Sequence, residues 1–421
     1  MQADLIIKNA AQLVTPYFLQ EQDDRSDRFG GLLLLADAAI ACAKGTIIAV
    51  GETPDVMSQV DSSAATVLDA AGKTVLPGFV DAHTHLVFAA TREHEFEMRI
   101  QGVSYQEIAA AGGCILSSVR NIRNADVKDL VTQGLAWLDR FLAYGTTTVE
   151  VKSGYGLSME AELKMLRVMR ELNQQHPVEV IPTFLGAHEI PEEYKSRRNE
   201  YIELVINEMI PAVVEESLAE YCDVFCEQHV FTIEEAERIL TAALDAGLKP
   251  KIHADQLTAG GGAELAAKAG AVSADHLDHI TAEGIEALRQ SDVIPVLLPG
   301  AVFFLGLKKY APARDMIDAG LPVAIATDFN PGSCPSLSMP MMMSLACTQM
   351  GMTPAEALIA ATLHAARAVE REQKLAILAP GMQADIVVHD VANYKLLPYH
   401  FGMNFVETVV KNGKVVYQSQ Q

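Results

Sequence analysis

Short apolar stretches alternate with longer helical segments through the middle of the chain. From residue 78 onward, eight runs of apolar or β-branched residues have the length of strands, and segments with helical spacing separate them. The predicted strands are 78–83, 146–152, 178–186, 221–227, 249–253, 271–276, 292–298 and 322–328. Eight strands alternating with helices over roughly three hundred residues predict an α/β fold of the (β/α)8 TIM-type barrel class. A doubly wound sheet would fit the alternation too, but polar residues at the strand ends favour the barrel.

Helices of this region carry recognisable start signals. The segments 232–235 and 353–356 each have the Thr-x-x-Glu spacing of a capping box, and the first of these helices should end at Gly247. The segment 159–173 places leucines and a methionine on one stripe, which predicts a helix that packs one face on the core.

Both ends of the chain have β character instead. The predicted strand segments are 4–14, 38–50 with a turn at Lys44-Gly45, 66–74, 385–389, and a hairpin over 407–417 around Asn412-Gly413. The polar segment 20–30 has no periodicity and predicts a surface loop. Because neither end is long enough for a good β domain alone, we expect residues 1–75 and 378–421 to form one small β-sandwich domain, with the barrel at 76–377.

Composition and charge narrow the class of protein. Half of the residues are hydrophobic and 20% are charged, which predicts a large core. The formal net charge of −22 argues against nucleic-acid and anionic membrane partners, and an anionic substrate would need a local basic residue. The six cysteines include no Cys-x-x-Cys pair, so we expect reduced thiols. With no signal peptide or membrane-length apolar stretch recognised, we expect a cytoplasmic protein.

Polar side chains stand where the predicted strands end. His83 and His85 are two residues apart at the end of the first strand, so both point to the same face. The other strand-end positions hold Lys152, Tyr155, His188, Glu227, His253, His276 and Asp328. A lone His-x-His pair could equally be a surface feature, and His188 or His276 alone a structural histidine. However, five of the twelve histidines fall at these ends, which converge on one face of a barrel.

This set of side chains suits a metal ion. Three imidazoles and one carboxylate are typical ligands of Zn2+ or iron, with one position open to water. Such an ion lowers the pKa of bound water toward ~7, which predicts hydrolytic chemistry at an electrophilic carbon.

Several motifs resemble the amidohydrolase superfamily. The stretch from Pro77 to His85 (PGFVDAHTH), with histidines on the fifth and sixth strands and an aspartate on the eighth, is similar to the superfamily as a whole. More specific segments resemble those members that open an imidazolone ring in histidine degradation. They are 87–92 (VFAATR), 152–157 (KSGYGL), 184–188 (FLGAH), 273–277 (SADHL), 297–301 (LLPGA) and 327–333 (TDFNPGS). The resemblance covers the whole barrel and reaches Ala384-Asp385 in the tail.

The resemblance implies a function for each matching position. One divalent metal, Zn2+ or Fe2+/Fe3+, would be bound by His83, His85, His253 and Asp328. Substrate contacts are implied for Arg92, Tyr105, Tyr155, His188, Gln256, Asn330, Gly332 and Ser333. The implied substrate, 4-imidazolone-5-propanoate, is a small anion whose carboxylate the guanidinium of Arg92 would hold. From the residues alone, Arg92 would be assigned to a surface ion pair, and the turn 330–333 could offer its backbone amides to the pocket.

The implied reaction is hydrolysis of the cyclic amide C–N bond to give N-formimidoyl-L-glutamate. Metal-bound hydroxide would attack the ring carbonyl carbon, His276 would take a proton or stabilise the oxyanion, and Asp328 would protonate the departing nitrogen. Two departures affect this scheme. Gln256 stands where some relatives have a glutamate that could act as a base, and Glu227 stands where two-metal members often have a bridging lysine. Lys152 lies on a different strand, so we expect a single metal.

Two alternatives remain open at this point. A metal-dependent deaminase of a cyclic amidine or nucleobase would share the metal ligands but would not need Arg92 and Tyr155 to hold a carboxylate. A non-catalytic scaffold on the same fold would typically lose metal ligands, and this chain keeps all four. A homodimer is expected by resemblance and from the frequency of two-fold symmetric enzymes.

Overall fold

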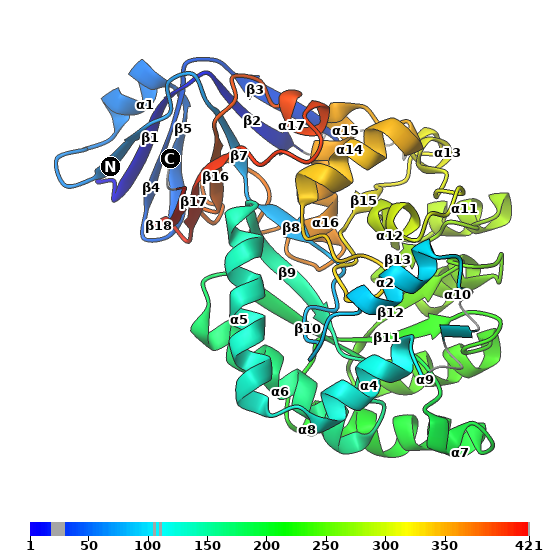
Figure 1. Cartoon of the computed structure of the whole chain (residues 1–421). Coiled ribbons are helices and arrows are strands. Elements are labelled where there is room, and N and C mark those ends of the chain that lie inside the picture. The colour runs from blue at the N-terminus through cyan, green and yellow to red at the C-terminus, as the bar shows by residue number, and fades with distance from the viewer. Residues whose placement is uncertain (18–29, 104–106, 109–111, 420–421) are drawn as a thin grey trace.

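A computed structural model describes residues 1–17, 30–103, 107–108 and 112–419. Eight parallel strands form one sheet whose order follows the sequence (Figure 1). They are β8 Phe79–Asp81, β9 Thr146–Lys152, β10 Glu179–Ala187, β11 Tyr221–Cys226, β12 Lys249–Ala254, β13 Ser273–His276, β14 Ile294–Leu297 and β15 Ala324–Ile325. Each overlaps one predicted strand, so the prediction of eight barrel strands is confirmed.

The barrel closes just beyond the ends of its first and last strands. Thr84 and Phe329 form a parallel bridge, the amide of Asp328 donates to the carbonyl of His83 (3.0 Å), and the amide of His85 donates to the carbonyl of Phe329 (2.8 Å). Asp328, between the end of β15 and this bridge, adopts a left-handed conformation (φ 54°). Closure therefore joins the two segments that carry predicted metal ligands.

Helices surround this sheet (Figure 1). In chain order they are α2 Glu93–Ile100, α4 Ile115–Asn124, α5 Val127–Ala143, α6 Met159–Gln175, α7 Arg198–Leu204, α8 Ile210–Glu215, α9 Ile233–Asp245, α10 Gly262–Ala269, α11 Ala282–Arg289, α12 Pro299–Phe304, α13 Ala313–Asp318, α14 Met339–Met350, α15 Pro354–Ile359 and α16 Ala365–Arg367. Both predicted capping boxes are present, at Thr232 before α9 and at Thr353 before α15. Helix α6 buries the predicted apolar stripe, which confirms its orientation.

The two ends of the chain form two further sheets beside the barrel (Figure 1). The four-stranded sheet has the order β5-β4-β1-β6, and the six-stranded sheet has the order β18-β17-β16-β7-β2-β3. Their elements are β1 Leu5–Ala10, β2 Gln12–Tyr17, β3 Gly31–Leu35, β4 Ala38–Ala43, β5 Thr46–Glu52, α1 Thr53–Gln59, β6 Thr66–Asp69, β7 Thr74–Pro77, β16 Ile386–His389, α17 Leu396–Tyr399, β17 Val406–Lys411 and β18 Lys414–Gln418. Side chains from both ends share one core, for example Ile7, Val75 and Ile386.

Two predicted strands of this part are wrong in one respect. The segments 4–14 and 66–74 are each two strands, and in both cases the chain passes from one sheet to the other between them. The turn between β6 and β7 contains Gly72 with φ 77°, a conformation that glycine adopts without strain. Most of the predicted loop 20–30 lies outside the described residues. The division into 1–75 with 378–421 and 76–377 stays a proposal.

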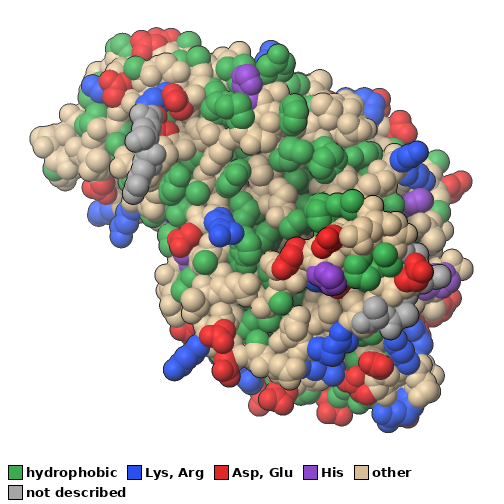
Figure 2. All heavy atoms as spheres, in the orientation of Figure 1, with side chains coloured by type: hydrophobic (Ala, Val, Ile, Leu, Met, Phe, Trp, Pro, Cys, Tyr) green, Lys and Arg blue, Asp and Glu red, His purple; other side chains and the backbone are tan. Residues whose placement is uncertain are grey.

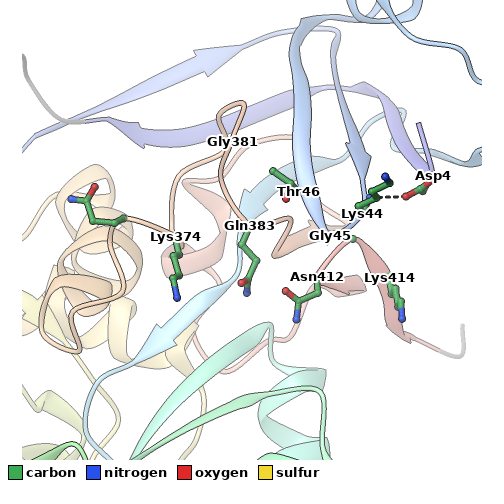
Figure 3. Close-up of a pocket in the computed structure, with 11 residues that line it drawn as sticks. Asp4, Lys44, Gly45, Thr46, Lys374, Gly381, Gln383, Asn412 and Lys414 are labelled. Atoms are coloured by element: carbon green, nitrogen blue, oxygen red, sulfur yellow. Dashed lines mark hydrogen bonds between the residues drawn. The ribbon is translucent and has the colours of Figure 1, made fainter. Parts of the chain in front are cut away.

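Hairpin turns at the two ends approach each other. Lys44-Gly45 and Asn412-Gly413 have positive φ at both positions, as predicted from the Asn-Gly signal for the second hairpin. Beside them a cavity of about 810 Å³ is lined by Lys44, Lys374 and Gln383, among others (Figure 3). None of the predicted site residues lines this cavity, so it is distinct from the barrel mouth. Among the described helices, none is long and apolar enough to cross a membrane.

Candidate metal centre and active site

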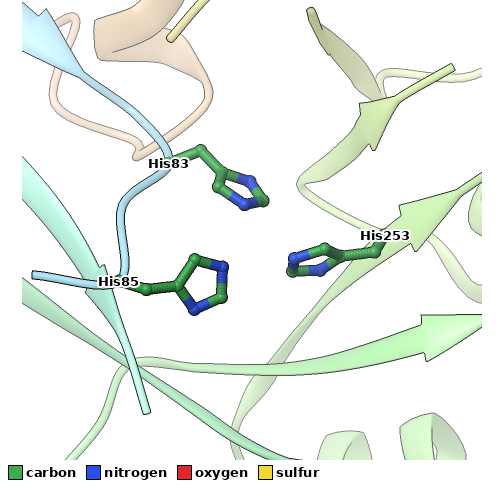
Figure 4. A group of neighbouring side chains, drawn as sticks. All are labelled: His83, His85 and His253. Carbon is green, nitrogen blue, oxygen red and sulfur yellow. The ribbon is translucent and has the colours of Figure 1, made fainter. Parts of the chain in front are cut away.

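Three predicted ligands come together at the barrel mouth. His83 and His85 follow β8, His253 lies in β12, and their nearest ring nitrogens are all within 4.8 Å of one another. Figure 4 shows the three imidazoles pointing toward a common centre. Asp328 lies beside them, with its Oδ1 3.6 Å from His83 Nε2 and 3.7 Å from His85 Nε2. The structure thus brings together all four predicted metal ligands.

The residues present fit a divalent metal. Within the described part of the chain, His83 Nε2 and His253 Nε2 are buried and have no hydrogen-bond partner. Leaving two buried polar atoms without partners costs free energy, which a shared cation would relieve. Burial, and then neighbouring positive groups, hold the pKa values of His83 and His85 well below the ordinary range. Both imidazoles are therefore neutral and have a lone pair for coordination.

Asp328 is placed to exchange a proton. The residue is 2% exposed, and burial raises the pKa of the carboxyl to about 7. Asn330 Nδ2 donates to the Asp328 carbonyl (2.7 Å), and Ser333 Oγ donates to Asp328 Oδ2 (3.3 Å). The turn after β15 therefore fixes the orientation of this carboxylate.

In the turn 330–333, backbone amides donate hydrogen bonds to a side chain of the same turn. Asn330 Oδ1 accepts from the amides of Gly332 (2.8 Å) and Ser333 (2.7 Å). The expectation that these amides line the pocket for a ligand is wrong, because the Asn330 side chain already occupies them. The hydroxyl of Ser333 and the side chain of Asn330 remain beside Asp328.

Aromatic rings form one wall of the site. The imidazole of His188 stacks on that of His85 with a centroid distance of 5.0 Å and an interplanar angle of 13°, and Tyr155 lies 5.6 Å from His85. His188 Nδ1 lies 3.0 Å from the carbonyl of Gly154, so Nδ1 carries the proton and Nε2 is an acceptor. Burial lowers the pKa of His188 to about 3 and raises the pKa of Tyr155, so both are neutral at pH 7.

His276 lies at the same cluster, as the last residue of β13. Its ring centroid is 5.5 Å from that of His83 and 5.3 Å from that of His253. Its backbone has φ 79°, a strained conformation that turns the chain at the end of the strand. Burial lowers the pKa of His276 well below the ordinary range, which makes it a neutral base or hydrogen-bond donor.

The guanidinium of Arg92 lies against Gly332, in the turn that follows Asp328. A Cβ atom on Gly332 would clash with the guanidinium of Arg92, so the two residues are in close contact. Glu95 Oε2 accepts from Arg92 Nε (3.0 Å) and pairs with Nη2 (2.9 Å). Arg92 therefore has an ion-pair partner, as its sequence neighbours suggest, and is also placed beside the turn that carries Asp328.

The remaining residues singled out from the sequence are Gln256, Tyr105 and Glu227. Gln256 is partly buried in the loop after β12. Tyr105 lies outside the described residues. The carboxylate of Glu227 accepts from the amides of Leu257 (2.8 Å) and Thr258 (3.2 Å) and from the Thr258 hydroxyl. Glu227 is therefore committed to that loop.

Sequence reasoning missed the carboxylates that contact the ligands. Asp275 Oδ2 is 2.6 Å from His83 Nδ1, and Asp223 Oδ2 is 3.1 Å from His253 Nδ1. Lys152 lies between these carboxylates; burial disfavours its charge, but Asp223, Glu150 and Asp275 outweigh burial and raise its pKa. The sequence did hold a sign of these buried charges. Glu150 and Lys152, and likewise Lys251 and His253, are two residues apart on buried strands, so the side chains of each pair point to the same face.

Comparison with known proteins agrees with this geometry. The model of the amidohydrolase family matches residues 74–416. An imidazolonepropionase of Geobacillus kaustophilus (strain HTA426) is 49% identical over 98% of this chain and 97% of its own length. One from Alkaliphilus metalliredigens (strain QYMF) is 46% identical over 99% of this chain and 98% of its own.

Solved structures show the same fold at low identity. An adenosine deaminase from Xanthomonas campestris with bound zinc has a TM-score of 0.71 at 21% identity, covering 98% of this chain and 93% of its own. Guanine deaminase of E. coli has a TM-score of 0.73 at 14% identity, covering 99% and 100%. From the family match and the near-full-length relatives, the chain belongs to the amidohydrolase family, and within it to the imidazolonepropionases.

Proposed function

We propose that this chain hydrolyses the cyclic amide C–N bond of 4-imidazolone-5-propanoate to give N-formimidoyl-L-glutamate, a step of L-histidine degradation. The observation that carries the proposal is the 49% identity to an imidazolonepropionase over 98% of the chain, which includes the whole barrel mouth. Water adds its oxygen to the ring carbonyl carbon, the bond from that carbon to nitrogen breaks, and the nitrogen takes a proton.

The proposed cofactor is one divalent metal held by His83, His85, His253 and Asp328. Three imidazoles and a carboxylate suit Zn2+ and iron alike, so Zn2+ and Fe2+/Fe3+ are both candidates. When bound, such an ion supplies Lewis acidity that lowers the pKa of water and polarises a carbonyl. Glu227 is occupied by amides of the loop after β12, which supports a single-metal site.

Proton transfer is proposed for His276, which lies beside the metal ligands, and for the ligand Asp328. His276 is neutral and buried beside His83 and His253, so it can take a proton or donate a hydrogen bond to the carbonyl oxygen in the transition state. Asp328, buried beside His83 and His85, is proposed to deliver the proton to the departing nitrogen. Ser333 keeps that carboxylate in place.

Substrate binding is proposed for the wall and the turn around the metal site. Arg92 would pair with the propanoate carboxylate, which the net charge of −22 would otherwise repel. Tyr155 and the Nε2 acceptor of His188 would hold the ring and its substituents. Further contacts are proposed for Tyr105, Gln256, Asn330, Gly332 and Ser333.

Loss of imidazolone absorbance on adding the enzyme tests the reaction directly. A metal-stripped sample is the control, and we expect it to be inactive until Zn2+ or Fe2+ is returned. No activity on the imidazolone, together with release of ammonia from a nucleobase, would favour a deaminase instead.

We also propose a homodimer in the cytoplasm. Strand β3 is an edge of the six-stranded sheet, and Leu33 and Leu34 on it are 45% and 47% exposed. Tyr399, Phe401 and Met403 near α17 are exposed too, and Figure 2 shows apolar side chains gathered over that part of the molecule. Unpaired edges and apolar patches are typical of interfaces. Sedimentation equilibrium would show a single-chain mass if this proposal is wrong.

A further inference from the structure

Five charged side chains are enclosed in the barrel close to the metal ligands. They are Glu150 and Lys152 on β9, Asp223 on β11, Lys251 on β12 and Asp275 on β13, and none has any exposed surface. The set has one more carboxylate than ammonium group. Charges buried to this degree are costly unless they are paired, so their arrangement calls for an explanation beyond packing.

Lys152 joins the two carboxylates that contact metal ligands. Its Nζ is 2.7 Å from Asp223 Oδ2 and 3.2 Å from Asp275 Oδ2. Asp275 Oδ2 is in turn 2.6 Å from His83 Nδ1, and Asp223 Oδ2 is 3.1 Å from His253 Nδ1. One carboxylate therefore stands between the Lys152 ammonium group and each of two ligand histidines, His83 and His253.

The remaining two members, Lys251 and Glu150, have other partners than the ligand histidines. Lys251 Nζ pairs with Glu150 Oε2 (3.0 Å) and stands 5.0 Å from the centre of the Tyr221 ring. Glu150 Oε1 contacts Lys152 (3.0 Å) and accepts from the Thr183 hydroxyl (2.5 Å). Neither Lys251 nor Glu150 has an ion pair or hydrogen bond to a ligand histidine among the described residues.

We propose that Lys152, Asp223 and Asp275 form one positioning unit, in which Lys152 holds both carboxylates so that they fix the tautomer and orientation of His83 and His253 for the metal. Asp275 accepts the Nδ1 proton of His83, and Asp223 Oδ2 lies 3.1 Å from Nδ1 of His253, so both carboxylates favour the tautomer in which Nε2 is the lone-pair donor. Without the ammonium group between them, the two carboxylates would repel each other and move apart. A histidine whose outer nitrogen loses its acceptor binds metal less tightly.

The test compares two lysines of the same network by zinc affinity. Lys152→Met and Lys251→Met each remove one fully buried ammonium group, but only the first touches the carboxylates that contact histidines. Zinc dissociation constants are measured by competition with a chelator of known affinity, and unfolding in urea is followed on the metal-free proteins. We expect about a tenfold to hundredfold loss of zinc affinity for Lys152→Met. For Lys251→Met we expect a change of less than about threefold, even if both variants lose stability.

Equal losses of zinc affinity in the two variants would overturn the proposal, because they would show a general effect of removing buried charge. Wild-type affinity in Lys152→Met would overturn it as well. The isosteric pair Asp223→Asn and Glu150→Gln repeats the comparison without a change of volume, so the test survives if a methionine variant fails to fold. A loss confined to Asp223→Asn supports the proposal, and matching affinities in the pair contradict it.

This inference rests on the metal site proposed above, and the two can fail separately. Wild-type protein that takes up no zinc would overturn the metal site itself. Wild-type protein that binds zinc, with all four variants equal to it, would overturn only the positioning unit.

Discussion

Among single side chains, Glu95 controls where Arg92 can point. Its Oε2 binds the Nε and Nη2 edge of the guanidinium, while its Oε1 accepts from the amide of Cys114 (3.0 Å) and the hydroxyl of Ser117 (3.1 Å). The carboxylate is therefore fixed at both oxygens before it meets Arg92. Its position leaves the Nη1 side of Arg92 against Gly332 and the turn 330–333.

Replacing Glu95 by glutamine should weaken substrate binding more than chemistry. The variant removes the charge that orients Arg92 and keeps the side-chain volume, so we expect the KM for the imidazolone to rise about tenfold, with kcat within about threefold of wild type. Steady-state kinetics check this. Ser117→Ala is the matched control, since Ser117 touches only the other oxygen, and its KM should stay near wild type. A fall in kcat at constant KM in Glu95→Gln would contradict the role.

Replacing His276 should lower kcat without loss of the metal, which distinguishes its role from that of the metal ligands. Since it lies beside the ligand cluster without belonging to it, His276→Gln should keep its zinc while kcat falls about 10²- to 10⁴-fold, the usual contribution of a general acid or base. Metal analysis of the same preparation used for kinetics checks both halves. Near-normal turnover with metal bound would mean that Asp328 acts alone.

Among turns and strands, the loop after β15 links catalysis and recognition. Asn330 organises the turn, Ser333 contacts Asp328, and Gly332 leaves space that the Arg92 guanidinium fills. Gly332→Ala would force only the far end of a flexible side chain to move. We therefore expect unchanged urea unfolding and a KM raised severalfold. Unchanged kinetics would show that Arg92 does not need this position.

Strand β16 carries a second kind of buried histidine. His389 is fully buried 5.8 Å from the ring of Phe79, and neither of its nitrogens has a hydrogen-bond partner in the described structure. Burial lowers its pKa to about 3. Below pH 6.5 His389 is protonated in the unfolded chain, but in the folded chain it stays neutral down to about pH 3. The free energy of unfolding therefore falls as the pH drops from 6.5.

For one histidine the loss reaches about 2 kcal/mol at pH 5. Metal-free His389→Leu should lose that much less stability than metal-free wild type between pH 7 and pH 5, as measured by urea unfolding at each pH. His94→Leu, at an exposed position, is the control and should follow wild type. Parallel curves for His389→Leu and wild type would refute the assignment.

The sequence predicts this architecture well where a signal is local. Each barrel strand is a short apolar run, and a polar residue at its end points into the mouth by the geometry of the fold, so His83, His253 and Asp328 could be placed together. Contacts between strands have no such signal. The ion pairs from Lys152 to Asp223 and Asp275 depend on which strands are neighbours and on how far the lysine side chain extends. The hydrogen bond from the Ser333 amide to Asn330 Oδ1 depends on the rotamer of Asn330.

For the whole molecule, metal binding should add to the stability of the fold. The ligands come from β8, β12 and the segment after β15, so an unfolded chain cannot hold them together. At a zinc concentration a hundred times its dissociation constant, we expect the free energy of unfolding to rise by about 2.7 kcal/mol. Thermal unfolding with chelator and with added zinc measures this. Identical melting temperatures in the two conditions would argue against a site that needs the folded barrel.

The closure of the barrel beside Asp328 also has a consequence during synthesis on the ribosome. His83 and Asp328 are 245 positions apart, and the contacts that seal the barrel join their neighbours. At 5–20 residues per second, roughly 12–50 s pass between the synthesis of the first and the last of these residues. Throughout that interval the edge of the sheet at β8 has no segment after β15 to pair with. A nascent chain that stalls before residue 328 would therefore expose an open parallel sheet, the kind of edge that chaperones protect from aggregation.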